Sequence, residues 1–155
     1  MAKDKGTKHL LKDDYRFSSK LISKFINKVM LDGKKSIAEK IVYSSLDKLS
    51  KEVNEDALSA FMTAISNVSP KMEVKSKRVG GSTYQVPIPV SEDRAQSHAI
   101  NWIIKYSRSK KGKSMTDCLT QELVDAYNNV GATAKKRDDT HKMAEANKAF
   151  AHFRW

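Results

Sequence analysis

The sequence predicts a mainly α-helical protein, with a single domain of about six helices and a protruding two-stranded β-ribbon. The chain has 155 residues, a common length for one domain with its own core. Apolar residues recur every three or four positions in six stretches, as they do on one face of a helix. Only the segment at residues 72–90 reads as two short strands around a glycine pair. We expect a basic N-terminal arm over residues 1–18 and a helical domain over residues 19–155.

The first half of the chain predicts three helices, at residues 20–31, 36–49 and 56–68. In the first, the apolar side chains form one stripe, and Gly33 follows as a stop signal. The third ends where residues 67–70 break the helical pattern before the ribbon. The residues of the second helix that we expect to face the core are Ile37, Ile41, Val42, Leu46 and Leu49.

The ribbon is the most informative segment of the chain. Gly80 and Gly81 supply the positive φ angles of a tight hairpin turn. Pro87 and Pro89 cannot donate ladder hydrogen bonds and suit only an edge position. The first strand is strongly basic, and Glu73 is its one acid. Because a lone two-stranded ribbon is marginal in water, we expect it to leave the helical body and find support on a polyanion.

The segment after the ribbon predicts a helix that Ser91 caps and that continues to about Arg108. Glu92 and Asp93 fall in its first turn, where the helix dipole favours acids. Its expected buried residues are Ala95, Ala99, Trp102, Ile103 and Tyr106.

Two further helices complete the predicted fold. Ser114 and Asp117 match a short-acid variant of the capping box, which predicts a helix start. That helix is expected to run to Val130 and to end at Gly131. The last one, over about residues 133–150, is alanine-rich and only weakly amphipathic.

Positive charge is segregated along the chain. The formal net charge is +11. Residues 1–20, 71–78 and 135–154 each carry +3, and residues 94–113 carry +6 without a single acid, so the remainder carries −4. Segregated charge of this kind is typical of proteins with a phosphate-rich partner. The alternative is a set of solvated lysine faces that serve solubility alone.

Side chains that could carry catalysis are poorly placed. Cys118 lies inside a predicted helix with no histidine near it in sequence, so we expect it to be packing filler. His141 and Glu145 stand four apart, but no third metal ligand has matching spacing. His98, at the edge of an apolar stripe, is expected to be packed with a satisfied nitrogen. The sequence therefore predicts no enzyme, no cofactor and no metal site.

The chain also lacks the sequence patterns of membrane and secreted proteins. No run of apolar residues approaches about 18 in length, and the first residues do not form a signal peptide. A single cysteine indicates a reducing compartment. We therefore expect a cytoplasmic protein with no membrane partner.

Basic residues recur in three structural settings: a flexible arm, the ribbon, and helix faces with their turns. Contacts spread over several elements suit a folded RNA better than a straight duplex groove, because RNA is recognised largely by shape. The helix N-terminus at Ser114 adds a seat for a phosphate. The candidate RNA-binding residues are Lys3, Lys5, Lys8, Lys12, Arg16, Lys20, Lys28, Lys34, Lys35, Lys75, Lys77, Arg78, Arg94, Lys105, Arg108, Lys110, Lys111, Lys113 and Ser114.

Aromatic residues leave two alternatives open. Tyr84, on the ribbon, either stacks on a base or packs on the body. The aromatic residues of the C-terminus, Phe150, Phe153 and Trp155, either stack on bases or fasten the end of the chain to the body. A DNA-binding architectural protein is the main alternative to an RNA binder, but it would need apolar wedges at the ribbon tip, and residues 79–82 offer little to intercalate.

Several motifs resemble the bacterial small-subunit ribosomal protein seven family. They are KFIN at residues 24–27, DGKK at 32–35, EVKSKRVGGSTYQVP at 73–87, KSM at 113–115, and KKR with THKMAEANKAFAH at 135–152. The similarity extends over about residues 15–155 without large gaps, and motifs of this length are specific. One departure stands out: the fourth helix keeps only Arg94 where the family usually has several arginines.

The resemblance implies a structural constituent of the small ribosomal subunit. It implies a primary binder of the 3′ major domain of small-subunit rRNA that nucleates assembly of the head. The implied neighbours are the exit-site tRNA and small-subunit ribosomal proteins nine and eleven. By position it adds Met115 to the rRNA-binding residues. The residues that it places near the tRNA are Gly80, Gly81, Tyr84, His141, Lys142, Asn147 and Lys148.

Overall fold

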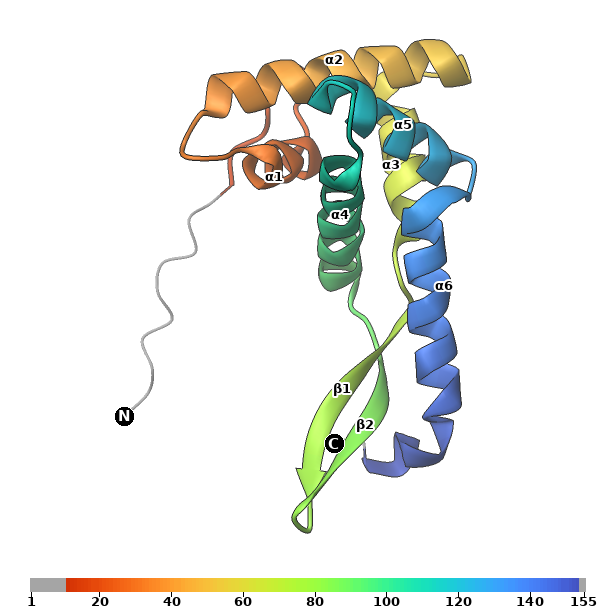
Figure 1. The fold of residues 1–155 in the computed structure, drawn as a ribbon. Coiled ribbons are helices and arrows are strands. Elements are labelled where there is room, and N and C mark those ends of the chain that lie inside the picture. Colours follow the sequence, from red (N-terminus) through yellow and green to blue (C-terminus); the bar gives the residue numbers. More distant parts are fainter. Residues whose placement is uncertain (1–10, 154–155) are drawn as a thin grey trace, which may run out of the picture.

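Six α-helices, one two-stranded ribbon and a short 3-10 helix make up residues 11–153, which are the residues that the computed structural model describes (Figure 1). This confirms the predicted mainly helical fold with one hairpin. In chain order the elements are α1 (Lys20–Val29), α2 (Lys35–Val53), α3 (Ala57–Val68), β1 (Met72–Val79), β2 (Ser82–Pro89), α4 (Glu92–Ser109), α5 (Met115–Tyr127), α6 (Gly131–Ala146) and the 3-10 helix η1 (Lys148–Phe153).

The core lies among the first five helices, with α5 packed against α2, α3 and α4. Phe25 of α1 and Phe61 of α3 meet there with ring centroids 5.1 Å apart. Burial of such side chains contributes about 1.5–3 kcal/mol each, so this cluster is the main source of stability. Its largest fully buried residues are Ile22, Phe25, Ile26, Leu46, Leu49, Phe61, Ile65, Ile100, Ile103, Leu119 and Leu123.

Two predicted core faces need correction. Ile37, expected to point inwards from the first turn of α2, is 53% exposed and lines a surface groove instead. On α4, Ile100 and Ile104 are buried, whereas Trp102 and Tyr106 are only half-buried. The helix contacts α1, α3, α5 and α6, so its buried face is wider than one stripe.

The ribbon pairs in antiparallel register from Met72 opposite Pro89 to Val79 opposite Ser82. Gly80 and Gly81 form its turn with φ of 58° and 88°, as a two-residue turn with both residues left-handed requires. Within the described residues it is the one sheet, so both strands have free edges, which accommodates the prolines.

The ribbon is braced by the end of the chain. Figure 1 shows β1 and β2 extending away from the body, with α6 running alongside and η1 turning in beneath. The ring of Tyr84 lies 5.3 Å from that of Phe150 and 4.9 Å from that of Phe153, centroid to centroid. Of the two alternatives left open for Tyr84 and the C-terminal aromatic residues, packing within the protein is therefore the one seen, and η1 gives the ribbon an apolar partner.

The junction between α5 and α6 also differs from the prediction. The helix α5 ends at Tyr127, and Gly131 begins α6 instead of ending α5. Asn129, just after α5, takes a left-handed φ of 57°. Gly131 itself has φ of 86°, and a Cβ there would lie 3.0 Å from Cβ of Asp125. The predicted helix at 133–150 is thus split into α6 and η1.

The inner end of the N-terminal arm belongs to the folded body. Asp14 is buried and accepts hydrogen bonds from the backbone N–H groups of Phe17 and Ser19 at 2.9 and 3.0 Å. The Tyr43 hydroxyl donates to the same carboxylate at 3.3 Å. These bonds hold the inner end of the predicted arm against α2. Lys3, Lys5, Lys8 and Trp155 lie outside the described residues.

No helix in residues 11–153 combines the length and apolar character needed to cross a bilayer.

Candidate nucleic-acid interface

The α1–α2 turn and the α4–α5 connection, far apart in sequence, meet at one groove of about 450 Å³. Three predicted RNA-binding residues line it: Lys34 from the first segment, and Arg108 and Met115 from the second. Arg108 is held there because its Nη2 donates to the backbone oxygen of Val29 at 3.0 Å. The rest of the lining is Val29, Met30, Leu31, Asp32, Ile37, Ala38 and Ile41.

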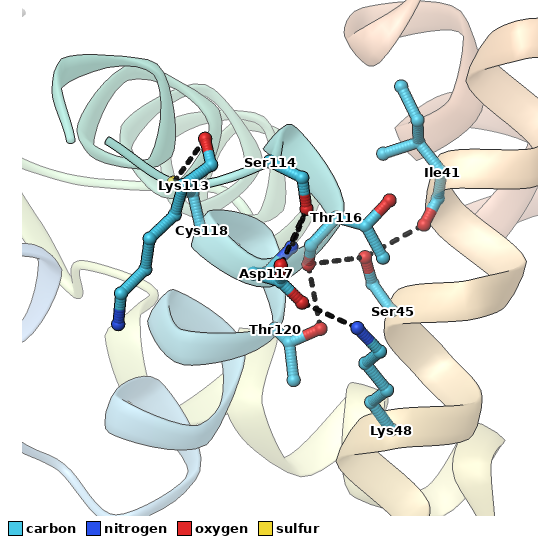
Figure 2. Close-up of polar contacts among 9 residues, drawn as sticks. All are labelled: Ile41, Ser45, Lys48, Lys113, Ser114, Thr116, Asp117, Cys118 and Thr120. Atoms are coloured by element: carbon cyan, nitrogen blue, oxygen red, sulfur yellow. Dashed lines mark hydrogen bonds and ion pairs between the residues drawn. The ribbon is translucent and has the colours of Figure 1, made fainter. Parts of the chain in front are cut away.

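The start of α5 is fixed by its cap (Figure 2). Ser114 Oγ accepts from the backbone N–H of Asp117 at 3.2 Å, as the capping pattern predicted. The hydroxyl also donates to Asp117 Oδ2 at 2.7 Å. Lys48 of α2 places Nζ 2.5 Å from Asp117 Oδ1. Hydrogen bonds from Lys48 and Ser114, with the charge of Lys48, lower the pKa of Asp117. The negative charge of Asp117 is therefore balanced by Lys48.

A buried serine ties the same turn to α2. Ser45 Oγ lies 2.7 Å from the backbone oxygen of Ile41 and 3.1 Å from that of Thr116 (Figure 2). Cys118, in the first turn of α5, is also buried, with Sγ 3.8 Å from the backbone oxygen of Lys113. Cys118 is thus a packing residue, as predicted. The helix start that presents Lys113 and Met115 is rigidly seated.

Four of the predicted RNA-binding cations pair with acids of the same chain, the longest pair being Lys35 Nζ with Glu39 at 4.0 Å. Lys110 Nζ lies 2.9 Å from the buried carboxylate of Glu122, which also accepts from Thr133 Oγ1 at 2.9 Å. Arg94 Nε lies 2.6 Å from Glu73, and Arg16 Nη2 lies 2.5 Å from Asp47. The guanidinium carbon of Arg16 also lies 5.4 Å from the centroid of the Tyr43 ring.

Glu73 forms the centre of a small network at the base of the ribbon. His98 Nε2 lies 2.9 Å from Glu73 Oε2, and the imidazole stacks on Trp102 at 5.5 Å, so His98 is packed and satisfied as predicted. Burial alone would raise the pKa of Glu73. Hydrogen bonds from Arg94 and His98, with the charges of those two residues, outweigh it and lower that pKa. The network fastens β1 to the first turns of α4.

The remaining predicted cations of the described part point outwards. Each is exposed, and its side chain has no hydrogen bond or ion pair within residues 11–153. The group consists of Lys12, Lys20, Lys28, Lys34, Lys75, Arg78, Lys105, Lys111 and Lys113.

The residues that the resemblance places near a tRNA lie on the ribbon and along α6 and η1. His141 Nε2 accepts from the backbone N–H of Lys71 at 2.9 Å, which joins α6 to the start of β1. Lys148 lies 3.5 Å from Glu145, with both side chains largely exposed. Asn147 donates to the backbone oxygen of Met143 at 2.8 Å. Tyr84 packs on η1, and Lys77 Nζ donates to the backbone oxygen of Phe153 at 3.2 Å.

Arg137 is a residue that sequence reasoning did not single out. Its Nη1 donates to the backbone oxygen of Asn67 and, at 2.8 Å, to Asn129 Oδ1, and its Nη2 lies 2.8 Å from Asp138. These bonds join the end of α3, the α5–α6 turn and α6. No signal in the sequence distinguishes this arginine from the exposed cations. Arg137 therefore stabilises the fold by joining these three segments.

The chain matches a known protein family over almost its whole length. The model of the family described as ribosomal protein S7p/S5e matches residues 1–148. The chain belongs to the ribosomal protein S7 family. The family is one of ribosomal structural proteins and not of enzymes, as the sequence predicted. No cluster of three or more potential metal-ligating side chains occurs in the described part of the chain.

Individual members of the S7 family are similar to the chain along most of its length. The protein of Petrotoga mobilis is 59% identical over 135 residues, or 87% of each chain. That of Tropheryma whipplei (strain Twist) is 54% identical over 143 residues, or 92% of each. That of Fervidobacterium nodosum is 50% identical over the full 155 residues of both. All three are named small ribosomal subunit protein uS7.

Proposed function

We propose that this protein is a structural constituent of the small ribosomal subunit that binds rRNA through the α1–α2 turn and the α4–α5 connection. The observation that carries the proposal is the convergence of Lys34, Arg108 and Met115 on one groove, with the exposed Lys111 and Lys113 beside it in sequence. Cations from separate segments, set on packed helices, suit the irregular phosphate arrangement of a folded RNA.

Rigid seating of these cations favours binding. Each phosphate that they neutralise releases counterions from the RNA, which supplies affinity without sequence specificity. The hydrogen bonds of Ser45, Ser114 and Arg108 fix the groove before RNA arrives. Less conformational entropy is therefore lost on binding than with a flexible arm.

Within the subunit, the proposed target is the 3′ major domain of small-subunit rRNA, and the protein nucleates assembly of the head. The ribbon and α6 lie near the exit-site tRNA, with Arg78 and Lys142 as exposed cations on those elements. Ribosomal proteins nine and eleven are the proposed protein neighbours, in the cytoplasmic ribosome. Family membership supports these assignments, together with the exposure of these cations on the ribbon and α6.

A binding comparison tests this function. The full chain is titrated against a 3′ major domain rRNA fragment, an rRNA fragment of equal length from another domain, and a DNA copy of the first. We expect the first RNA to bind most tightly, because A-form shape and 2′-hydroxyl groups contribute to recognition. Equal affinity for all three would reject rRNA-specific binding.

A further inference from the structure

The groove between the α1–α2 turn and the α4–α5 connection is lined mainly by apolar side chains, with Lys34 and Arg108 as its two cations. Met30, Ile37, Ile41 and Met115 contribute apolar side chains. Leu31 and Ile37 are 60% and 53% exposed, so two large apolar side chains lie uncovered at one surface site. Grouped exposed apolar residues often mark an interaction site. The volume of about 450 Å³ is within the range of small-ligand sites.

The charged side chains of the lining are mostly positive. Lys34 is exposed and its side chain has no partner within residues 11–153. Arg108 donates one hydrogen bond, from Nη2 to the backbone oxygen of Val29. The other N–H groups of its guanidinium can therefore donate to an anion. Asp32 is the acid of the lining, and its carboxylate accepts hydrogen bonds only. A groove lined by apolar side chains and two cations therefore matches a nucleotide, whose base has a flat stacking face and whose phosphates are anionic.

We propose that this groove receives one unpaired base of the bound RNA, while Lys34 and Arg108 hold the phosphates on either side of it. The proposal rests on rRNA binding by this face and adds a contact to a base. RNA presents such bases in its loops and bulges, where they are free to leave the stack. Asp32 accepts a hydrogen bond from an amino group of the base. An apolar segment of a protein would cover the apolar side chains but leave both cations without counter-charge.

The test separates the base from the phosphates. Ile37→Ala removes one wall of the groove, and Met62→Ala removes a similarly exposed apolar residue (54%) from α3 as a matched control. Each full-length variant is titrated against the 3′ major domain rRNA fragment over a range of salt concentrations. Bases protected from a base-modifying reagent are mapped in parallel.

For Ile37→Ala we expect about tenfold weaker binding, from the lost contact of one to two methylene groups. The slope of affinity against salt concentration stays as in the wild type, because no charge is lost. One unpaired base that the wild type protects becomes reactive, and Met62→Ala changes none of these readouts. Leu31→Ala, in the facing turn, is expected to reproduce the effect and replaces Ile37→Ala if that variant does not fold.

Wild-type affinity and base protection in both groove variants would overturn the proposal. If those variants bind RNA normally but fail to assemble with another small-subunit protein, the groove is a protein site and the proposal is equally wrong. If Lys34→Ala weakens binding and lowers the salt slope while both groove variants have no effect, rRNA binding stands and only the base contact fails. If the wild type does not bind the rRNA fragment, the proposed function itself is wrong.

Discussion

Lys110 places its ammonium 2.9 Å from Oε1 of Glu122, whose side chain is only 2% exposed. The sequence alone assigns Lys110 to RNA binding, yet the contact is one that holds α5 and the α4–α5 connection together. A buried carboxylate that loses its cation is costly. We therefore expect Lys110→Ala to lower the free energy of unfolding by about 2–4 kcal/mol, as measured by chemical denaturation.

Lys111→Ala is the matched control for this prediction. Lys111 follows Lys110 in the sequence, and its side chain is exposed and has no ion pair or hydrogen bond within residues 11–153. We expect its free energy of unfolding to stay within about 0.5 kcal/mol of the wild type, while its rRNA affinity falls. Equal stability of the two variants would contradict a structural role for Lys110.

The packing of Tyr84 on η1 gives a second prediction. Tyr84→Ala removes aromatic contacts with Phe150 and Phe153, each worth about 0.5–1.5 kcal/mol beyond the area buried. We expect η1 and the adjoining part of the ribbon to open more often, which hydrogen exchange of their backbone amides detects. Thr83→Ala, at an exposed position whose side chain faces the other side of the strand, should leave exchange unchanged. Unchanged exchange in both variants would show that η1 needs no help from Tyr84.

The lowered pKa of Asp117 predicts acid sensitivity at the start of α5. Because the folded-state pKa lies below the ordinary value of about 3.9, this carboxylate stabilises the fold above that value. Its contribution is lost as the pH falls through the folded-state pKa. We expect Asp117→Asn to be less stable than the wild type at neutral pH, with the difference shrinking towards pH 3. A constant difference in unfolding free energy from pH 7 to pH 3 would contradict this linkage.

Arg78 is expected to act on RNA and not on the fold. In the ribbon it stands opposite Thr83, and both residues are exposed, whereas the neighbouring pair Lys77 and Tyr84 faces η1. Arg78→Ala should weaken binding by about 1–3 kcal/mol if RNA desolvates the guanidinium, with no change in the unfolding transition. Affinity equal to that of the wild type would show that Arg78 stays solvated and makes no contact with RNA that contributes to binding.

Local rules predicted the fold wherever one element decides its own structure. The stripe of α1, the Asp117–Ser114 cap and the glycine turn of the ribbon are set by spacing and by φ, so they could be read directly. The bracing of the ribbon could not. It depends on Phe150 and Phe153, in a weakly amphipathic segment whose partner lies far away in sequence.

The site was predictable by segment and not by side chain. Charge runs located the α1–α2 turn and the α4–α5 connection. They could not show that Lys110 and Arg94 turn towards Glu122 and Glu73, because those acids belong to other elements. Exposure of Ile37 was equally hidden, since helical spacing alone assigns an isoleucine to the core.

The salt dependence of rRNA binding tests the central claim most directly. The triple variant Lys34→Ala/Lys111→Ala/Lys113→Ala removes three outward cations beside the groove. The control Lys40→Ala/Lys51→Ala/Lys135→Ala removes three exposed cations from α2 and α6. For the first, affinity for the 3′ major domain fragment should fall, and the slope of log affinity against log salt concentration should become shallower by roughly two to three. The control should keep the wild-type slope, and equal slopes in the two triple variants would contradict the account.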